Sequence, residues 1–272
     1  MFDLKLPSRI VCLTEETTEW LYCLGQQDRI VGISGYTVRP PEARRDKPRI
    51  SAFLSAKIDQ ILALKPDYVF GFSDLQADIA STLIRHGISV TIFNQRSIEE
   101  IISMLYQVGS IVGQANEALR QIEMIQSHLS QIQSRAAVFQ IRPKIYFEEW
   151  DSPSISGIKW VSELIEIAGG EDCFPELACH SLAKDRIIHD PQVVVDKNPD
   201  IIIGSWCGKK FRSNLVANRR GWSTISAVKN KQLYEIKSPH ILQPGPAALT
   251  DGVDQIHKII MNWQESKSKF VV

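Results

Sequence analysis

Two segments of this chain occur twice, in the same order, and this internal repeat constrains the fold more than any other feature. Residues 18–25 (TEWLYCLG) parallel residues 162–169 (SELIEIAG), and residues 65–71 (KPDYVFG) parallel residues 198–204 (NPDIIIG). Chance could give one such match, whereas two matches in one order indicate duplication. The sequence therefore predicts two halves built on one plan.

Strand and helix patterns alternate within each half. Short apolar runs predict strands, and amphipathic segments that end near glycine or proline predict the helices between them. The predicted strands are 9–13, 30–34, 68–71 and 90–93 in the first half, and 145–147, 201–204 and 233–236 in the second. One short helix is predicted to begin after Thr14. The others are predicted at 58–64, 75–86, 161–168 and 251–263. This alternation is typical of a parallel sheet covered on both faces, so each half is expected to be a doubly wound α/β lobe.

A long helix is predicted between the halves. In residues 114–137 the apolar residues Ala118, Ile122, Ile125, Leu129, Ile132 and Ala136 recur at intervals of four and three, which is the stripe of an amphipathic helix. About 23 residues at 1.5 Å each give a rod of roughly 35 Å. A coiled-coil partner helix is the alternative. We expect an N-terminal lobe (1–113), a linking helix (114–140) and a C-terminal lobe (141–272).

Composition excludes several classes of protein. The chain has 272 residues, of which 44% are hydrophobic, and its 31 basic and 31 acidic residues cancel. No basic run has the density of a nucleic-acid surface. No apolar run approaches the ~18 residues of a membrane span. The N-terminal residues show no signal-peptide pattern, so we expect a cytoplasmic protein, or a periplasmic one if the chain is a trimmed mature form.

The five cysteines predict neither a disulfide framework nor a metal site. Their number is odd and no CxxC pair occurs, so reduced thiols are expected. Cys173, Cys179 and His180 are close in sequence, but their spacing matches no zinc-binding pattern. We therefore expect no bound metal of the protein's own.

Several short matches give the chain a family resemblance. They are RIVGIS (29–34) followed by Tyr36, IDQI (58–61) leading to KPD (65–67), AGGE (168–171), NPD (198–200) and AVKN (227–230). In their order and spacing the chain resembles the helical-backbone substrate-binding proteins of ABC importers for iron chelates and cobalamin, most closely the cobalamin-binding type. The resemblance covers nearly the whole chain, from about residue 9 to 260. It implies two α/β lobes joined by one helix, and a ligand held in the cleft between them.

The loops that follow the predicted strands supply the candidate ligand contacts, because ligands of doubly wound sheets bind beyond the carboxyl ends of the strands. Aromatic rings suit the faces of a macrocycle, and polar groups suit its edges. The candidates are Glu15, Tyr36, Arg39, Phe72, Ser73, Gln95 and Arg96 in the first half, and Glu149, Trp150, Trp206 and His240 in the second. Phe53 joins them through the resemblance. Tyr36, Phe53, Trp150 and Trp206 are expected on loop rims.

The resemblance implies binding of a small molecule, cobalamin or another metal chelate, and an ABC permease as partner. His240 has the chemistry to ligate a chelated metal, although a solvated loop histidine is the alternative. Glu15, Glu16, Glu148 and Glu149 predict an acidic cleft. No nucleophile with a nearby base is evident, so no catalytic residue and no catalytic cofactor are expected.

The positions that dock on a permease are acidic in this family, one on each lobe. Asp59 occupies the first, whereas Gln192 occupies the second, with Asp190 nearby. A missing charge weakens such docking. Arg186 stands where the resemblance places a pocket tryptophan of the cobalamin binder. The alternative is therefore an intracellular carrier or sensor on the same fold without a permease.

Overall fold

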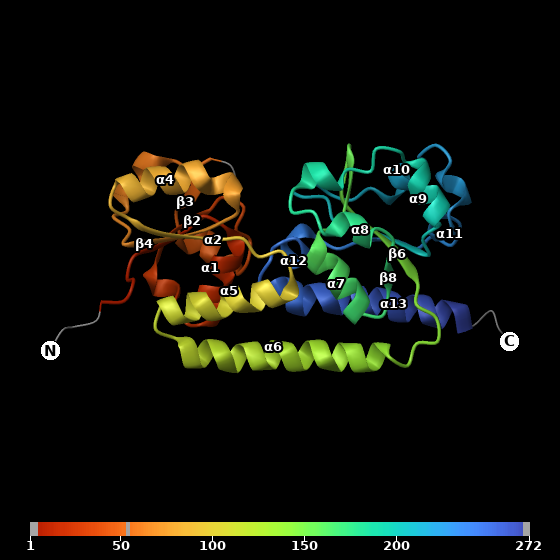
Figure 1. Ribbon diagram of the computed structural model, residues 1–272, viewed down its shortest axis with the longest axis horizontal. Helices are drawn as coiled ribbons and strands as arrows, with labels where there is room; N and C mark the ends of the chain where they lie inside the picture. The colour runs from red at the N-terminus through yellow and green to blue at the C-terminus, as the bar shows by residue number, and fades with distance from the viewer. Residues whose placement is uncertain (1–4, 53–54, 269–272) are drawn as a thin grey trace. The chain divides into compact units, whose positions relative to one another are not determined.

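The computed structural model describes residues 5–52 and 55–268 (Figure 1). The chain forms two α/β units. Unit 1 comprises residues up to Met124 together with Pro244–Pro246, and unit 2 comprises Ile125–Gln243 and the residues from Ala247 onward. Each unit has one sheet of five strands. The predicted fold class, two doubly wound α/β lobes with a long helix between them, is confirmed.

The sheet of unit 1 is parallel throughout. Its order is β3-β2-β1-β4-β5, with β1 at the centre. The strands are β1 (Ile10–Cys12), β2 (Ile30–Ser34), β3 (Arg49–Ser51), β4 (Tyr68–Phe72) and β5 (Ser89–Phe93). The sequence predicted all of these except the short β3. The core on one face joins Val11 and Val69 with Leu83 of a covering helix.

Helices cover both faces of this sheet (Figure 1). They are α1 (Glu15–Cys23), α2 (Pro41–Asp46), α3 (Ile58–Ala63), α4 (Ala77–Arg85) and α5 (Ile98–Ile111), and η2 (Asp74–Gln76) precedes α4. The sequence analysis missed α5, whose start carries a clear signal. Ser97 accepts a hydrogen bond from the Glu100 N–H, and the Glu100 side chain accepts one from the Ser97 N–H. This reciprocal capping box fixes the first turn of α5.

The sheet of unit 2 departs from the plan of unit 1. Its order is β10-β9-β6-β7, and β8 also pairs with β6. The strands are β6 (Lys144–Asp151), β7 (Ser154–Ser156), β8 (Glu171–Asp172), β9 (Ile201–Gly204) and β10 (Leu233–Glu235). β7 pairs antiparallel with β6, and the other pairings are parallel. β6 is longer than predicted because this hairpin extends its pairing beyond the parallel neighbours.

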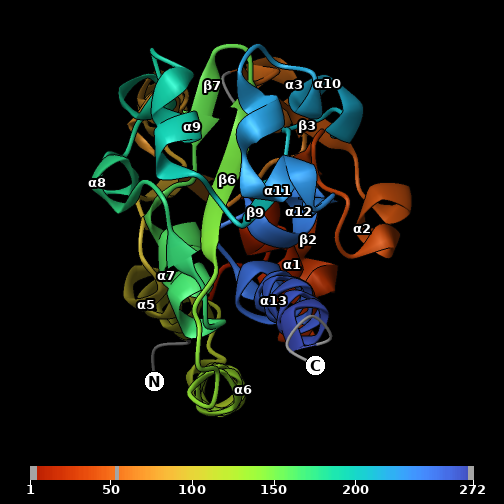
Figure 2. The same ribbon diagram turned by 90° about the vertical axis from the view of Figure 1, so that its right-hand side faces the viewer.

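Helices also cover the sheet of unit 2. Figure 2 shows α7, α8 and α9 on one side of β6, and α10, α11 and α12 on the other. The helices are α7 (Lys159–Ile167), α8 (Pro175–Ala178), α9 (Gln192–Lys197), α10 (Ser213–Ala217), α11 (Ser226–Lys229), α12 (Ser238–Ile241) and α13 (Val253–Ser268), with the 3₁₀ turns η3 (Ala183–Arg186) and η4 (Trp222–Thr224) and a π-helical turn at Ala248–Gly252. The indole N–H of Trp160 on α7 donates to the carbonyl of Ile241 at 2.9 Å, which ties α12 to α7.

The repeated KPD and NPD segments perform the same structural task in the two units. Lys65 and Asn198 both take a left-handed backbone conformation, with φ of 48° and 46°. Asp67 accepts a hydrogen bond from the Arg9 N–H at 3.0 Å, and Asp200 accepts one from the Lys144 N–H at 3.1 Å. In each unit the motif therefore turns the chain out of a helix and clamps the start of the first strand.

The predicted linking helix, α6 (Ala115–Ala136), is continuous. All six residues of its apolar stripe are buried. The boundary between the units falls inside it, after Met124. In unit 1 α6 packs tightly on α5, since a Cβ on Gly109 would lie 2.4 Å from the Ala118 Cβ. Among the residues that the structure describes, no helix combines the length and apolar character needed to cross a membrane.

Candidate functional site

The carboxyl end of β1 in unit 1 leads into two adjacent glutamates at the start of α1. Glu16 is 1% exposed, and its Oε1 accepts a hydrogen bond from the Thr14 hydroxyl at 2.7 Å. Burial, reinforced by the charge of Glu15, raises the pKa of Glu16 to about 8. Burial raises the pKa of Glu15 to about 7. At neutral pH this end of the sheet therefore carries less negative charge than its sequence implies.

The turn after β2 presents an aromatic ring to solvent. Tyr36 is 57% exposed, so its place on a loop rim is as expected. Arg39 of the same turn reaches back to α1, where its Nε donates to Glu19 at 2.8 Å. The guanidinium is thus engaged within unit 1. Phe53, another aromatic candidate of this half, lies outside the described residues.

The loops after β4 and β5 bring two further candidates together. The guanidinium carbon of Arg96 lies 4.4 Å from the centre of the Phe72 ring, a cation–π contact. Ser73 is buried with φ of 74°, and its hydroxyl accepts a hydrogen bond from the Leu75 N–H at the start of η2. Gln95 is also buried, and its amide donates to the Pro244 carbonyl at 3.2 Å. Phe72 and Arg96 therefore form one cluster, whereas the side chains of Ser73 and Gln95 are hydrogen-bonded to backbone groups.

The strand β6 of unit 2 carries two adjacent glutamates, and each is paired with an arginine. Glu148 is fully buried and accepts from both terminal nitrogens of Arg219, with Nη2 at 2.9 Å from Oε1. Glu149 accepts from both terminal nitrogens of Arg186, at 2.6 and 3.2 Å. The expected acidic character of this end is wrong for unit 2.

Glu148 is also the centre of a buried hydrogen-bond network. The Tyr146 hydroxyl donates to it at 2.9 Å, and the Trp206 indole N–H donates at 3.0 Å. Burial would lower the pKa of Arg219, but the hydrogen bonds and charge of Glu148 outweigh it and raise that pKa. Burial, together with the charge of Glu148, raises the pKa of Tyr146 well above its ordinary value. Sequence reasoning missed Arg219, because nothing in the local sequence links residues 71 positions apart.

Trp206 lies in the core rather than on a loop rim. It is 3% exposed, and its ring packs edge-on against Phe211 at 5.0 Å between centres. Its hydrogen bond to Glu148 satisfies the indole, which is why the residue tolerates burial. Trp150, in contrast, is partly exposed, and the ammonium of Lys209 lies 4.5 Å from its ring centre. Lys209 also forms an ion pair with Asp151.

Arg186 is a buried structural residue. It is 2% exposed, and besides Glu149 it donates to the Ser156 carbonyl on β7. A residue in this position presents no aromatic surface to a ligand. Its two contacts instead fasten η3 to the β6–β7 hairpin.

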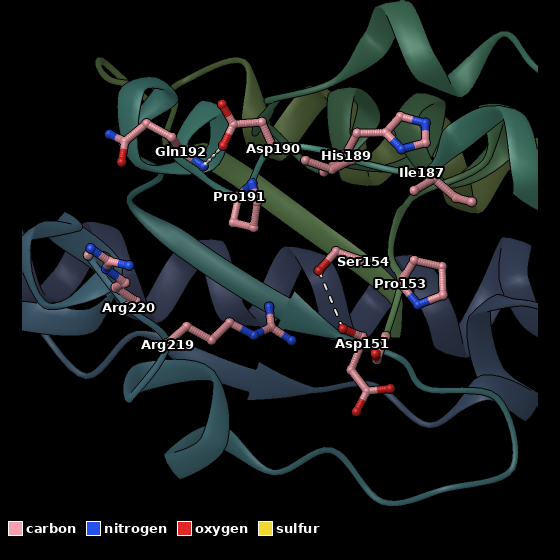
Figure 3. A pocket seen from close by; sticks show the side chains of 13 residues that line it. Asp151, Pro153, Ser154, Ile187, His189, Asp190, Pro191, Gln192, Arg219 and Arg220 are labelled. Atoms are coloured by element: carbon pink, nitrogen blue, oxygen red, sulfur yellow. Dashed lines mark hydrogen bonds between the residues drawn. The ribbon is translucent and has the colours of Figure 1, made fainter.

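An open pocket of about 790 Å³ lies on unit 2 (Figure 3). Its walls come from the β6–β7 turn, from the loop that enters α9, and from the turn before η4; they are Asp151–Ser154, Ile187–Gln192 and Arg219–Gly221. Gln192 is exposed here, but both its amides are engaged: the backbone N–H donates to Asp190 and the side chain to Asp196, each at 2.9 Å. The Asp190 carboxylate thus accepts the N–H of the first residue of α9.

The two remaining candidates, His240 and Asp59, belong to different units. His240 is on α12, and its Nδ1 is 3.9 Å from the Asp251 carboxylate, so it faces an acid within unit 2. Asp59 is exposed in the first turn of α3 in unit 1. Within residues 5–52 and 55–268, no three His, Cys, Asp or Glu side chains are grouped so that they could hold a metal ion.

Comparison with known proteins gives consistent matches along the chain. The model of a family described as "Periplasmic binding protein" matches residues 10–240. The chain is 24% identical over 265 residues to an uncharacterized ABC transporter substrate-binding lipoprotein, YvrC, of Bacillus subtilis, covering 94% of this chain and 81% of that protein. It is 24% identical over 260 residues to the vitamin B12-binding protein of Vibrio cholerae, covering 91% of this chain and 87% of that protein.

A solved structure supports the same fold. The periplasmic heme-binding protein RhuT from Roseiflexus sp. RS-1 superposes with a TM-score of 0.78 at 19% identity, covering 93% of this chain and 99% of that one. At this identity the likeness concerns the fold alone.

Proposed function

Because the chain belongs to the periplasmic binding protein family, whose members bind a substrate for transport, we propose that it captures a corrinoid or an iron chelate for ABC-type uptake. The protein would hold this ligand as cargo and would not turn it over.

The observation that carries the proposal is an accessible aromatic ring near the strand ends of each unit, which in unit 2 lies beside a cation. Tyr36 is exposed beyond β2, and Trp150 lies beside Lys209 at the end of β6. Flat rings match the face of a macrocycle, and charged or amide groups match its edge. Glu148 and Glu149, on the same strand as Trp150, are both paired with arginines, which supports a ligand that does not need an acidic site.

A spectroscopic titration tests the proposal directly. The purified protein is mixed with cyanocobalamin, haem or a ferric siderophore, and the ligand absorption bands and tryptophan fluorescence are followed. We expect saturable binding of one of these classes with quenching of the tryptophan fluorescence. Absence of saturable binding for all three would contradict the proposal.

A matched pair of variants identifies the contact in unit 1. Tyr36→Ala is expected to weaken binding by about 1–3 kcal/mol, the usual cost of removing an aromatic anchor. Tyr106→Ala is the control, since Tyr106 is a comparably exposed tyrosine on α5, away from the strand ends. Equal affinities of the two variants would remove Tyr36 from the site.

The engagement of Gln192 favours a second candidate, a carrier or sensor that works without a permease. Asp59 offers an exposed charge on unit 1, whereas the amide of Gln192 is already bonded to Asp196. Uptake into vesicles that contain a cobalamin-type permease separates the two functions. Stimulated uptake supports transport, and tight binding without stimulation supports the carrier.

A further inference from the structure

A short segment from the second half of the chain is built into unit 1. Pro244–Pro246 belongs to unit 1, although the residues on both sides of it belong to unit 2. All three residues are buried. Proline has no backbone N–H, so Gly245 carries the one amide proton of this Pro-Gly-Pro segment. The segment can therefore be buried while leaving few backbone donors to satisfy.

Gly245 is in close contact with Glu16. A Cβ on Gly245 would lie 2.5 Å from the Glu16 Cβ and 3.2 Å from its Cα. The backbone of Gly245 is not in the left-handed region, so the contact alone, and not a special conformation, requires glycine here. The segment thus packs directly against the Glu16 side chain.

Gln95 holds the segment from a second element. Its side-chain amide donates to the Pro244 carbonyl at 3.2 Å, and the residue is buried. Its Oε1 has no hydrogen-bond partner among the described residues. Because its Oε1 is already unpaired, breaking the bond to the Pro244 carbonyl would leave the buried Gln95 side chain without any hydrogen bond, which costs free energy. Gln95 therefore favours the bound position of Pro244.

The surroundings of Glu16 disfavour its ionised form. On α1, Glu15 and Glu19 add negative charge, and Glu19 is paired with Arg39 of the β2 turn. Cys12 of β1 stays a neutral thiol, since burial raises its pKa to about 12. Gln95 and the Pro-Gly-Pro segment carry no charge. Ionised Glu16 would therefore have to reach water, and its carboxylate is shielded from water while the segment stays in place.

We propose that Glu16 is a proton-operated latch: its side chain packs against Gly245 and holds Pro244–Pro246 on unit 1 while its carboxyl is neutral, and its ionisation releases the segment. The neutral form predominates below pH 8 because of the raised pKa of Glu16. The equilibrium constant for release of the segment then rises with pH, by at most tenfold for each pH unit above that value. The latch does not depend on the identity of the ligand. It makes the attachment of Pro244–Pro246 to unit 1 reversible.

Amide hydrogen exchange measures the latch. Selective ¹⁵N-glycine labelling reports the Gly245 amide among the 15 glycines of the chain. Protection factors, corrected for the intrinsic pH dependence of exchange, are compared at pH 6.5 and 9.5. We expect wild-type protection of Gly245 to fall by about tenfold or more. Glu16→Gln, which cannot ionise, should keep its protection at both pH values.

Two further variants complete the test. Glu42→Gln on α2 removes an exposed glutamate of unit 1 and should reproduce the wild-type loss. Gly245→Ala, followed by ¹⁵N-alanine labelling, should lose protection of the Ala247 and Ala248 amides at both pH values, while unchanged near-ultraviolet circular dichroism shows that the variant is folded. Equal losses in wild type and Glu16→Gln, or full protection in Gly245→Ala at pH 6.5, would overturn the latch.

Discussion

The two units handle buried carboxylates near the end of their first strand in opposite ways. In unit 1 Glu16 lies near other acids, with no arginine among its hydrogen-bond partners in the described part of the chain, and its pKa is raised to about 8. In unit 2 Glu148 is equally buried, but it has a bidentate arginine and two further donors. A buried acid can be accommodated by protonation or by pairing, and this chain uses both. The stability of unit 1 should consequently depend on pH, whereas the buried acid of unit 2 is held by its ion pair.

The largest effect is expected from breaking the pair in unit 2. Arg219→Ala leaves Glu148 buried without its counter-charge, so the free energy of unfolding should fall by about 3–5 kcal/mol. Urea denaturation monitored by tryptophan fluorescence measures this. Arg212→Ala, an exposed arginine of the same unit, is the control and should change stability by less than about 0.5 kcal/mol. A loss as small as that of the control would mean that the pair is not structural.

The next effect concerns pH and unit 1. Glu16 has a raised folded pKa, so its contribution to stability is fully present below its unfolded value of 4.5 and is lost as pH rises toward 8. Wild type should lose about 2–4 kcal/mol of unfolding free energy between pH 5 and 8.5 relative to Glu16→Gln. Denaturant titrations of both proteins across this range test it. Parallel pH curves for the two would contradict the raised pKa.

A smaller effect sharpens the assignment of the ligand. Lys209 lies over Trp150, and its charge suits a ligand with carboxylates such as haem, whereas the side chains of cobalamin end mostly in amides. Lys209→Met keeps the apolar stem, so it should weaken haem binding by about 1 kcal/mol and leave cobalamin binding unchanged. Lys210→Met, the adjacent exposed lysine, is the matched control. Identical behaviour of both variants would place Lys209 outside the site.

The smallest effect is expected at the docking positions. Gln192→Glu places a carboxylate next to Asp196, which should cost about 0.2–0.5 kcal/mol of stability through like-charge repulsion. The same charge should raise permease-stimulated uptake without changing ligand affinity, because charge-assisted contacts are stronger than neutral ones. Gln60→Glu, beside Asp59, controls for added charge. An unchanged uptake rate in Gln192→Glu would indicate that Asp190 or another group serves this surface.

Local sequence predicted most of the fold because its signals are short-range. The duplicated KPD and NPD segments specify a turn and a strand start through residues that are neighbours in the chain, and both units use them in the same way. The stripe of α6 was readable because helical periodicity needs no partner to be recognised. Weak signals were lost: β3 and β8 are very short, and the antiparallel β7 depends on pairing with β6.

The candidate site was predicted less completely, because burial and pairing are long-range properties. Tyr36 lies where the strand-end rule places it. The same rule placed Trp150 and Trp206 on loop rims, whereas Trp150 lies within β6 and Trp206 belongs to the core. The sequence by itself determined two α/β units, their repeated turns and the helix between them, since these follow from periodicity and turn chemistry. Which carboxylates are paired depends on the tertiary structure: Glu148 and Glu149 meet arginines 71 and 37 residues away, whereas Glu16 packs against Gly245 and burial raises its pKa.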